Sequence, residues 1–302
     1  MAVDRSGIDC SIVIIDNNST DNTAEFVEEY RHRLPIILLR ETRPGKNCAL
    51  NKALRECVLK NIVVFSDDDV TPDRNWLQEI VRATTKWPEI AVFGGSIELL
   101  WPDNRQPVWV AADWIKAFGY SWHHYADGEA LYNGSDSPFG PNFWVRKLVF
   151  QKVPFFDESI GPRPKNRIMG SETLFLLGLH RAGFQMLYCP AAMVQHRIHR
   201  KECRVSALQR RGFTFGRGKI RLNGLHRHRL YVKSKFLWFL VLMADYLYAS
   251  LRFLFGSMLR NPRRNCEITV DSMVRFGRLR ETMIQVMKRT ESKPRDDCIR
   301  NS

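Results

Sequence analysis

Three consecutive carboxylates, Asp67, Asp68 and Asp69, follow directly on an apolar run in the stretch FSDDDV. Like charges in a row repel one another, and a strand that ends at an ordinary surface has no need of them. Carboxylate oxygens are hard ligands that suit Mg²⁺ or Mn²⁺, and Asp is short enough to hold an ion tightly. The stretch therefore indicates a site for a divalent cation or for a cation bridged to phosphates. The structural alternative is a solvated acidic turn.

Short apolar runs rich in β-branched residues alternate with amphipathic stretches through the first hundred residues. This alternation predicts strands separated by helices, and hence an α/β fold with a mostly parallel sheet covered on both faces. Ligands of such sheets bind at the carboxyl ends of the strands, where DNNSTD and SDDD both lie. The predicted strands are 11–15, 35–40, 61–66 and 90–99, and the predicted helices are 47–58 and 74–87, with a further helix after residue 20.

The remainder of this region is less regular. Residues 101–140, rich in Trp, Pro, Gly and Asp, are expected to form an irregular excursion over the surface. A helix is predicted for 172–184, followed by a strand over 185–190 that ends at its proline. The seven cysteines are scattered without a C-x-x-C pair, which favours reduced thiols over a disulfide framework or a zinc site. No signal peptide is visible at the N-terminus.

The positive charge is confined to the last third of the chain. From Arg197 onward there are 25 Lys and Arg against 8 Asp and Glu, a net of +17, whereas residues 1–196 carry −3. Such asymmetry predicts two functional regions, the second facing an anionic partner such as phospholipid or nucleic acid.

Five motifs occur in a characteristic order: IIDNNSTDNT, RPGKNCALNKAL, VVFSDDDVTPDRNWL, GPNFWVRK with FFDESIG, and GSETLFLLGLHRAGFQMLYCPAAMVQH. Together they resemble the family 2 glycosyltransferases over about residues 10–220. The resemblance implies the GT-A fold, a Rossmann-like arrangement of a mostly parallel sheet and flanking helices, in residues 1–220. A basic helical region, residues 221–302, follows it. The implied activity is transfer of a sugar from a nucleotide-diphospho-sugar with inversion.

The three aspartates match the D-x-D pattern of this family. The match implies that Asp69 binds a divalent ion directly, that Asp67 lies near the ribose or the ion, and that Asp68 faces the donor sugar. Mn²⁺ or Mg²⁺ is the implied cofactor, because a divalent ion absorbs the charge that develops on the departing diphosphate.

Two loops match positions at which the family holds the nucleotide. Asp16 stands where the base is read, and a carboxylate there accepts a hydrogen bond from N3–H of uracil, which favours a UDP-sugar donor. In RPGKN, Gly45 lets the backbone come close to the nucleotide, while Arg43 or Lys46 pairs with base or phosphate. For the two basic side chains, simple exposure is the open alternative. For residues 19–21, a helix cap is the preferred interpretation.

Members of this family carry a general base for the acceptor hydroxyl, which is an Asp in a G-E-D motif. Here the segment reads GSE, so the resemblance implies Glu172 as the base, one methylene longer than the usual Asp. Its structural alternative is a carboxylate that complements a helix N-terminus. Asn142 matches a G-x-N motif that lines the donor or acceptor pocket. His196 matches a His that completes the metal site in some relatives, with a purely structural His as the alternative.

The chain departs from the family at its beginning. The family starts with a strand and a helix before the strand that ends in Asp16, and this chain lacks both. Because that strand lies within the sheet and contacts the base, we expect an exposed sheet edge. Two interpretations stay open: an enzyme with a truncated start, or a non-catalytic remnant that binds nucleotide weakly or not at all.

The apolar segment 236–259 is interrupted by Asp245 and flanked by basic residues on both sides. A charge near the middle disfavours a spanning helix, and symmetric basic flanks would not orient one. An amphipathic helix on an anionic membrane surface fits the pattern, with a buried core helix and a true span as alternatives. We therefore expect a peripheral enzyme at the cytoplasmic face of the cell membrane, acting on a saccharide or a lipid-linked acceptor.

Nucleic-acid binding is the competing function for a basic tail. The aromatic residues of the tail are gathered into one apolar block rather than spread among the charges as stacking platforms. No helix-turn-helix, zinc-finger or RNA-recognition signature occurs. We therefore expect no nucleic-acid partner.

Overall fold

The computed structural model describes residues 3–134, 136–153, 155–163, 167–223 and 235–291. The chain divides into two compact units, Met1–Arg204 and Val205–Ser302. The sequence predicts a boundary at residues 220 and 221, whereas helix α6 (Val205–Asn223) lies wholly within the second unit. It does so because it packs along another helix of that unit.

The elements of the first unit follow the predicted pattern, with additions after residue 66. The strands are β1 (Ile12–Asp16), β2 (Ile36–Arg40), β3 (Ile62–Ser66), β4 (Val70–Pro72), β5 (Val92–Leu100), β6 (Ala130–Leu131), β7 (Asn142–Arg146) and β8 (Met186–Arg197). The helices are α1 (Thr23–Glu28), α2 (Lys46–Glu56), α3 (Trp76–Lys86), α4 (Asp113–Tyr120) and α5 (Ser171–Arg181), with 3-10 turns at η1 (Pro102–Asn104) and η2 (Lys147–Gln151).

The larger sheet has the order β3-β7-β5-β8-β4, with β6 paired to β8. The β5–β8 pairing is parallel, whereas β7 is antiparallel to both β3 and β5. Strands β3, β5 and β8 therefore point in one direction, and their carboxyl ends meet at one edge of the sheet. The predicted α/β fold is confirmed, and the larger sheet is mixed because the short strands β4, β6 and β7 add antiparallel pairs.

The two faces of the larger sheet carry separate apolar clusters, because successive side chains of a strand point to opposite faces. Phe143 stacks on Phe65 of β3 and packs with Phe175 of α5 on one face. The next residue, Trp144, stacks on Phe93 of β5 on the other face, which α3 covers. Cover on both faces explains why β3 and β5 are continuous apolar runs in the sequence.

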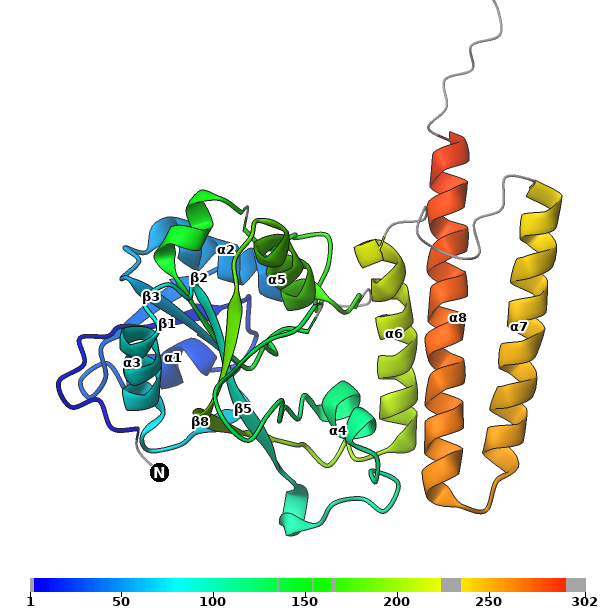
Figure 1. Ribbon diagram of the computed structural model, residues 1–302, viewed down its shortest axis with the longest axis horizontal. Helices are drawn as coiled ribbons and strands as arrows, with labels where there is room; N and C mark the ends of the chain where they lie inside the picture. Colours follow the sequence, from blue (N-terminus) through cyan, green and yellow to red (C-terminus); the bar gives the residue numbers. More distant parts are fainter. Residues whose placement is uncertain (1–2, 135, 154, 164–166, 224–234, 292–302) are drawn as a thin grey trace, which may run out of the picture. The chain divides into compact units, whose positions relative to one another are not determined.

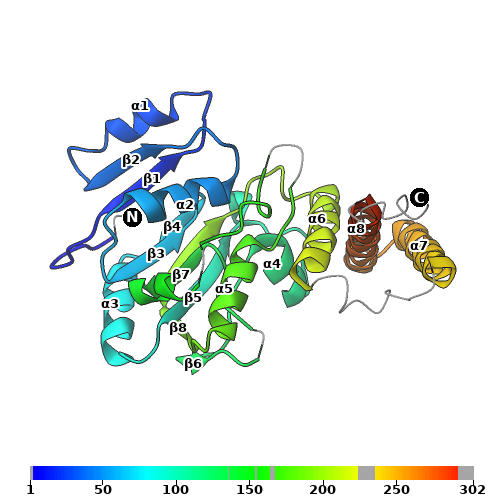
Figure 2. The same cartoon turned by 90° about the horizontal axis from the view of Figure 1, so that it is seen from above.

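Strands β1 and β2 form a separate parallel pair, aligned from Ile12 opposite Ile36 to Asp16 opposite Arg40. Among the described residues, β1 is hydrogen-bonded to β2 alone, and β3 to β7 alone. Figure 2 shows this pair next to α1 and apart from β5 and β8. The free edge of β1 agrees with the exposed sheet edge expected from the sequence.

Strand β8 is twice as long as expected, and Pro190 does not end it. The strand continues to Arg197, and its register against β5 shifts between Gly95 and Ile97. Ser96 Oγ donates a hydrogen bond of 2.7 Å to the carbonyl oxygen of Pro190 at this irregularity. A proline has no N–H to donate, so it is tolerated at a bulge of this kind.

The segment 101–140 is more ordered than predicted. It contains α4, whose Ile115 and Tyr120 are buried, and the Tyr120 ring packs edge-on against Trp101 at a centroid distance of 4.7 Å. Its eight residues are too few for a clear helical period, which is why the sequence did not indicate it.

The second unit consists, in its described part, of α6, α7 (Lys235–Met258) and α8 (Pro262–Glu291). Figures 1 and 2 both show α8 between α6 and α7. Helices α6 and α8 approach closely at glycines: a Cβ on Gly277 would lie 1.9 Å from the carbonyl oxygen of Phe213. Glu281, fully buried, pairs with Arg217 and Arg221 at 3.0 and 2.6 Å across the same contact.

Helix α7 accounts for most of the predicted apolar segment 236–259. Its stretch Leu240–Met258 is long and apolar enough to cross a membrane by length and composition, but only 17% of that stretch is buried. The basic residues that precede it, at positions 226–233, lie outside the described residues.

Candidate active site

The carboxyl end of β3 places the three aspartates at the edge of the larger sheet, where β7 begins opposite Ser66. Asp68 is exposed to solvent, whereas Asp67 and Asp69 are partly buried. The two outer aspartates therefore face other groups of the protein, and Asp68 between them faces solvent.

Lys46, in the first turn of α2, joins two of the predicted site carboxylates. Its Nζ lies 2.5 Å from Oδ1 of Asp67 and 2.7 Å from Oε1 of Glu172, all three side chains being about three-quarters buried. Burial lowers the pKa of Lys46, but the two carboxylates raise it more, so the pKa lies above its usual value. Groups separated by 21 and 126 positions in the sequence thus meet in one cluster.

Glu172 lies in the first turn of α5, where the partial positive charge of the helix favours a carboxylate. Burial raises the pKa of Glu172, but the charge and hydrogen bond of Lys46 lower it more, so the group is ionised at neutral pH. Gly140 makes room for it, because a Cβ on Gly140 would lie 3.0 Å from the Glu172 carboxyl carbon. The glycine of the GPN motif therefore permits the observed position of the carboxylate.

The neighbouring Ser171 ties α5 to α2. Its Oγ donates a hydrogen bond to Oδ1 of Asn47, whose side-chain amide donates in turn to the carbonyl oxygens of Asp157 and Ile160. The residue that replaces the usual Glu of the G-E-D motif is thus buried and structural. It fixes the turn that carries Glu172 against the turn that carries Lys46.

Asp69 faces His196 of β8, with 3.3 Å between Oδ2 and Nε2. The other ring nitrogen, Nδ1, lies 2.5 Å from the carbonyl oxygen of Tyr120; because that oxygen can only accept, Nδ1 carries a proton. Burial raises the pKa of Asp69, but the hydrogen bond and charge of His196 lower it more. Oδ1 of Asp69 is buried and has no hydrogen-bond partner.

Asp16 lies at the end of β1, beside a hollow of about 340 Å³ lined by residues of β1, β2 and the start of α1. Its Oδ1 accepts a hydrogen bond of 2.9 Å from the backbone N–H of Ser19, and hydrogen bonding to Ser19 lowers the pKa of the carboxyl group. The N-cap of α1 is Asn22, which makes no side-chain cap, but Oδ1 of Asp21 accepts hydrogen bonds from the backbone N–H and the hydroxyl group of Thr23, the first residue of the helix. Of residues 19–21, Asp21 therefore contributes to the start of α1, as the preferred interpretation had it.

The RPGKN loop is held by Asn17, a residue that the sequence did not single out. Its amide donates to the carbonyl oxygens of Glu41 and Arg43, and its Oδ1 accepts from the Gly45 N–H at 2.8 Å. Gly45 has φ = +133°, a conformation that favours glycine, and precedes α2 directly. Arg43 is already paired, with Glu41 at 2.8 Å and Glu158 at 2.9 Å.

Asn142 requires a correction. Expected to line the donor or acceptor pocket, it is 0% exposed. Its amide nitrogen donates to the carbonyl oxygens of Ser96 and Ala192, and its Oδ1 accepts from Trp76 Nε1 at 3.0 Å. These bonds join β7 to β5, β8 and helix α3, so Asn142 supports the site from within the core.

Within the described residues, no group of three or more His, Cys, Asp or Glu side chains is arranged to hold a metal ion. The strongest pair of candidate ligands is Asp69 with His196. Asp67, the third predicted ligand, is occupied by Lys46 instead.

Residues 2–150 match the sequence model of Glycosyl transferase family 2. This part of the chain belongs to glycosyltransferase family 2. This glycosyltransferase is 25% identical over 190 residues to an O-antigen chain rhamnosyltransferase of Salmonella anatum, an alignment covering 61% of this chain and 56% of that protein. It is 24% identical over 226 residues to a succinoglycan biosynthesis protein of Rhizobium meliloti, covering 72% of this chain and 67% of the relative. The chain therefore spans between about half and two thirds of the length of these two relatives.

Solved structures show the GT-A fold of the glycosyltransferase. A mannosyltransferase from Pyrobaculum calidifontis, in complex with GDP-Man and Mn²⁺, superposes with a TM-score of 0.54 at 16% identity, covering 90% of this chain and 77% of that one. GalNAc-T7, with UDP, GalNAc and Mn²⁺, superposes with a TM-score of 0.50 at 14% identity, covering 94% and 52%. At these identities the likeness establishes the fold alone.

Proposed function

We propose that this glycosyltransferase moves a sugar from a nucleotide-diphospho-sugar to a hydroxyl group of a saccharide or lipid-linked acceptor, by a single displacement that inverts the anomeric carbon. The observation that carries the proposal is the cluster of Lys46, Asp67 and Glu172 at the carboxyl end of β3. The cluster holds one ammonium group and two carboxylates in fixed positions. The ammonium group suits the diphosphate of a donor, and a carboxylate suits an acceptor hydroxyl that must lose its proton.

In the proposed step, Glu172 accepts the proton of the acceptor hydroxyl. The acceptor oxygen forms a bond to the anomeric carbon while the bond from that carbon to the diphosphate oxygen breaks, and the nucleoside diphosphate leaves with the electron pair. Lys46 keeps Glu172 ionised and thus able to take the proton. One displacement inverts the centre, whereas retention by double displacement requires a nucleophilic carboxylate on the other face of the sugar.

A divalent ion fits the neighbouring pair of side chains. Oδ1 of Asp69 lacks a partner although buried. Nδ1 of His196 keeps its proton on the Tyr120 carbonyl oxygen, so that Nε2, which lies 3.3 Å from Oδ2 of Asp69, would become a nitrogen ligand on losing its proton to the solvent. We propose that Asp69 and His196, with Asp67, hold Mn²⁺ or Mg²⁺, which when bound offsets the negative charge of the diphosphate. The diphosphate and water would complete the ligand set. The Mn²⁺ in the two similar structures supports this proposal.

For the donor, we propose that Asp16 reads the base and that the exposed Asp68 faces the sugar. Gly45 would let the backbone approach the nucleotide. Lys46 and Arg43 each pair with two carboxylates, and Lys46 is the stronger candidate for the phosphate-facing cation because its partners, Asp67 and Glu172, belong to the proposed site. A UDP-sugar remains the favoured donor on the strength of Asp16 alone.

The names of the relatives support a polysaccharide acceptor, since they refer to an O-antigen chain and to succinoglycan biosynthesis. We propose that the enzyme works peripherally at the cytoplasmic face of the cell membrane, where a lipid-linked saccharide would be presented. Its basic second unit supports an anionic partner of this kind.

Glu172→Gln tests the proposed base, with turnover followed as nucleoside diphosphate release from UDP-, GDP- and TDP-sugars in the presence of Mn²⁺. A general base contributes roughly 10²–10⁴-fold to the rate, so we expect a loss of that order with donor affinity unchanged within a few-fold. Glu89→Gln, an exposed carboxylate outside the site, is the matched control. Equal turnover of the Glu172→Gln variant and the wild-type chain would remove Glu172 from the mechanism.

The anomeric configuration of the newly formed glycoside, read by proton NMR and compared with that of the donor, tests inversion in a reaction that includes an acceptor. A wild-type chain that is folded but neither binds nor turns over any donor would support the non-catalytic remnant, which the separation of β1 and β3 favours.

A further inference from the structure

Helix α7 presents a continuous apolar face to the outside of the second unit. Leu247, Leu251, Leu254 and Met258 are 56%, 67%, 56% and 80% exposed. Their spacing of three and four residues places them in one stripe along the helix, together with Leu240. A contiguous exposed stripe of this size on a helix marks an interaction surface rather than scattered surface residues.

The opposite face of α7 is the one that packs against α8. Ala249 is fully buried there, and a Cβ on Gly256 would lie 2.8 Å from Ile268 Cγ2 of α8. Small residues therefore let the two helix backbones approach closely. Leu251, Leu254 and Phe255 remain more than half exposed.

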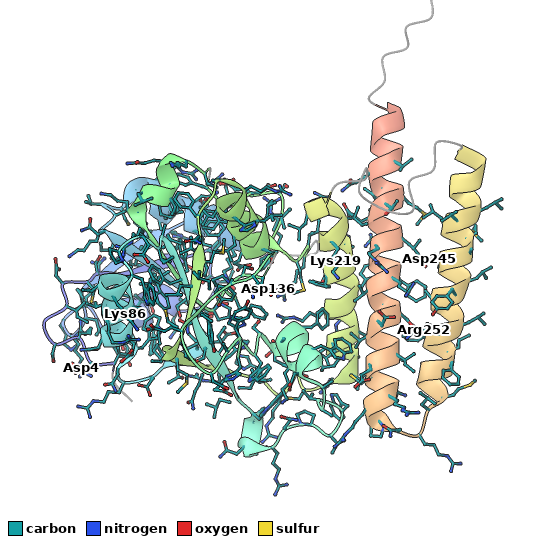
Figure 3. All side chains as sticks on the ribbon, viewed as in Figure 1. Asp4, Lys86, Asp136, Lys219, Asp245 and Arg252 are labelled. Atoms are coloured by element: carbon teal, nitrogen blue, oxygen red, sulfur yellow. The ribbon has the colours of Figure 1, made fainter. Side chains whose placement is uncertain are left out.

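Two charged residues of α7, Asp245 and Arg252, also lie on the side of α8. Asp245 pairs with Arg275 at 3.3 Å, and Arg252 pairs with Asp271 at 3.6 Å. The Arg275 guanidinium lies 4.9 Å from the ring centre of Tyr248. Figure 3 labels Asp245 and Arg252, which lie between α7 and α8. The helix thus turns Asp245 and Arg252 toward α8 and Leu247, Leu251 and Leu254 outward, the reverse of a helix that faces water.

The same contacts argue against α7 as a membrane span. The ion pairs of Asp245 and Arg252 bind α7 to α8 along its length, so α8 would have to enter the bilayer with it. Helix α8 carries eleven charged residues in thirty positions. Charges of that number are excluded from the hydrocarbon core. The outward face can reach lipid only with α7 lying along the surface.

The positive charge of the second unit favours an anionic lipid. Residues 205–302 contain 21 Lys and Arg against 7 Asp and Glu, a net of +14, and residues 1–204 are neutral. Arg260, Arg263 and Arg264 are exposed at the corner between α7 and α8, next to Met258 at the end of the stripe. Apolar side chains flanked by arginines match the acyl boundary and the headgroups of an anionic leaflet.

We propose that the outward face of α7 docks in the plane of an anionic lipid bilayer, with Leu247, Leu251 and Leu254 in the acyl boundary and Asp245 and Arg252 turned away from it toward α8. This inference deepens the peripheral location given under the proposed function and rests on that part of it. The face itself is defined without reference to donor or acceptor.

Flotation of the full chain with vesicles tests the docking. We expect binding to vesicles of phosphatidylcholine with about 30 mol% phosphatidylglycerol, weaker binding to pure phosphatidylcholine, and partial release at high salt. The triple variant Leu247→Gln, Leu251→Gln, Leu254→Gln should lower vesicle affinity at least tenfold. The matched control changes three exposed valines of the first unit, Val58, Val81 and Val108, to Gln and should bind as the wild type does.

Circular dichroism establishes that both triple variants are folded, and light scattering gives their oligomeric state. A wild-type dimer that the leucine variant dissolves, with vesicle binding unchanged, would assign the face to a second copy and overturn the proposal. Donor titration on the same variants separates the two claims: loss of vesicle binding alone leaves sugar transfer intact, and loss of donor binding alone leaves the docking intact.

The depth of the helix distinguishes docking from spanning. A fluorescent unnatural amino acid replaces Leu240, Leu247 or Leu254, one position at a time. Quenching of its fluorescence by lipid spin labels at shallow and at deep acyl positions then gives its depth in the bilayer. In-plane docking predicts the same shallow depth at all three positions. A spanning helix would place one position near the bilayer centre and the others progressively nearer a surface, and that gradient would contradict the proposal.

Discussion

At the scale of single residues, Lys46 organises the candidate site. One ammonium group holds carboxylates from two other elements, Asp67 after β3 and Glu172 on α5. The sequence indicated each of these residues through its motif, but it did not indicate that they meet. Motifs give residue types at fixed spacing, whereas an ion pair across 126 positions depends on the packing of α2 and α5 on one face of the sheet.

Lys46→Met should destabilise the first unit, because it leaves two mostly buried carboxylates without a counter-charge. We expect a loss of about 1–3 kcal/mol in the free energy of unfolding, less than for a fully buried pair because some solvent reaches the site. Urea unfolding followed by tryptophan fluorescence measures it, since seven of the eight tryptophans lie in residues 1–204.

The control is Lys52→Met on the same helix, which removes an ion pair with the half-exposed Glu56 and should cost less than about 0.5 kcal/mol. Equal effects of the two substitutions would mean that Lys46 is only another surface lysine.

At the scale of elements, the alternation of strands and helices predicted the α/β class, and four predicted strands agree with β1, β2, β3 and β5. The misses have physical reasons. β7 is central in the sheet but was recognised only as the GPN motif, because Asn142 at its start is polar and yet fully buried. Pro190 was taken as a strand end, although a bulge accommodates it within β8. In each case a tertiary contact outweighs the local signal.

Close packing of α6 on α8 gives a prediction for glycine substitutions. A Cβ on Gly216 would lie 2.0 Å from the carbonyl oxygen of Val274, whereas a Cβ on Gly212 would lie 3.0 Å from that of Val270. Gly216→Ala must move the helices apart and should destabilise the second unit by about 2–3 kcal/mol. Gly212→Ala should change its stability by less than about 1 kcal/mol, because alanine favours the helix and offsets the tighter contact.

Amide hydrogen exchange of α6 and α8 peptides in the full chain measures both effects. Faster exchange confined to Gly216→Ala agrees with the close approach, and equal protection in the two variants contradicts it.

At the scale of the whole molecule, charge and chemistry are divided between the two units. The neutral first unit contains every predicted site residue, and the second unit carries the whole net charge of +14. The sequence predicted this division from charge counts, which need no structure. It could not show on which side of α7 the leucines lie, because that depends on the ion pairs and glycines that select the face toward α8.

The central claim is a metal-dependent nucleotide site at the end of β3, and calorimetric titration tests it most directly. UDP, GDP and TDP are titrated with Mn²⁺ and with EDTA into the wild type, Asp69→Ala and the exposed control Glu89→Ala. We predict Mn²⁺-dependent binding of one nucleotide, unchanged in Glu89→Ala and weakened roughly 10–100-fold or more in Asp69→Ala. Binding that persists equally in EDTA and in Asp69→Ala, or no binding by the folded wild type, would contradict the account.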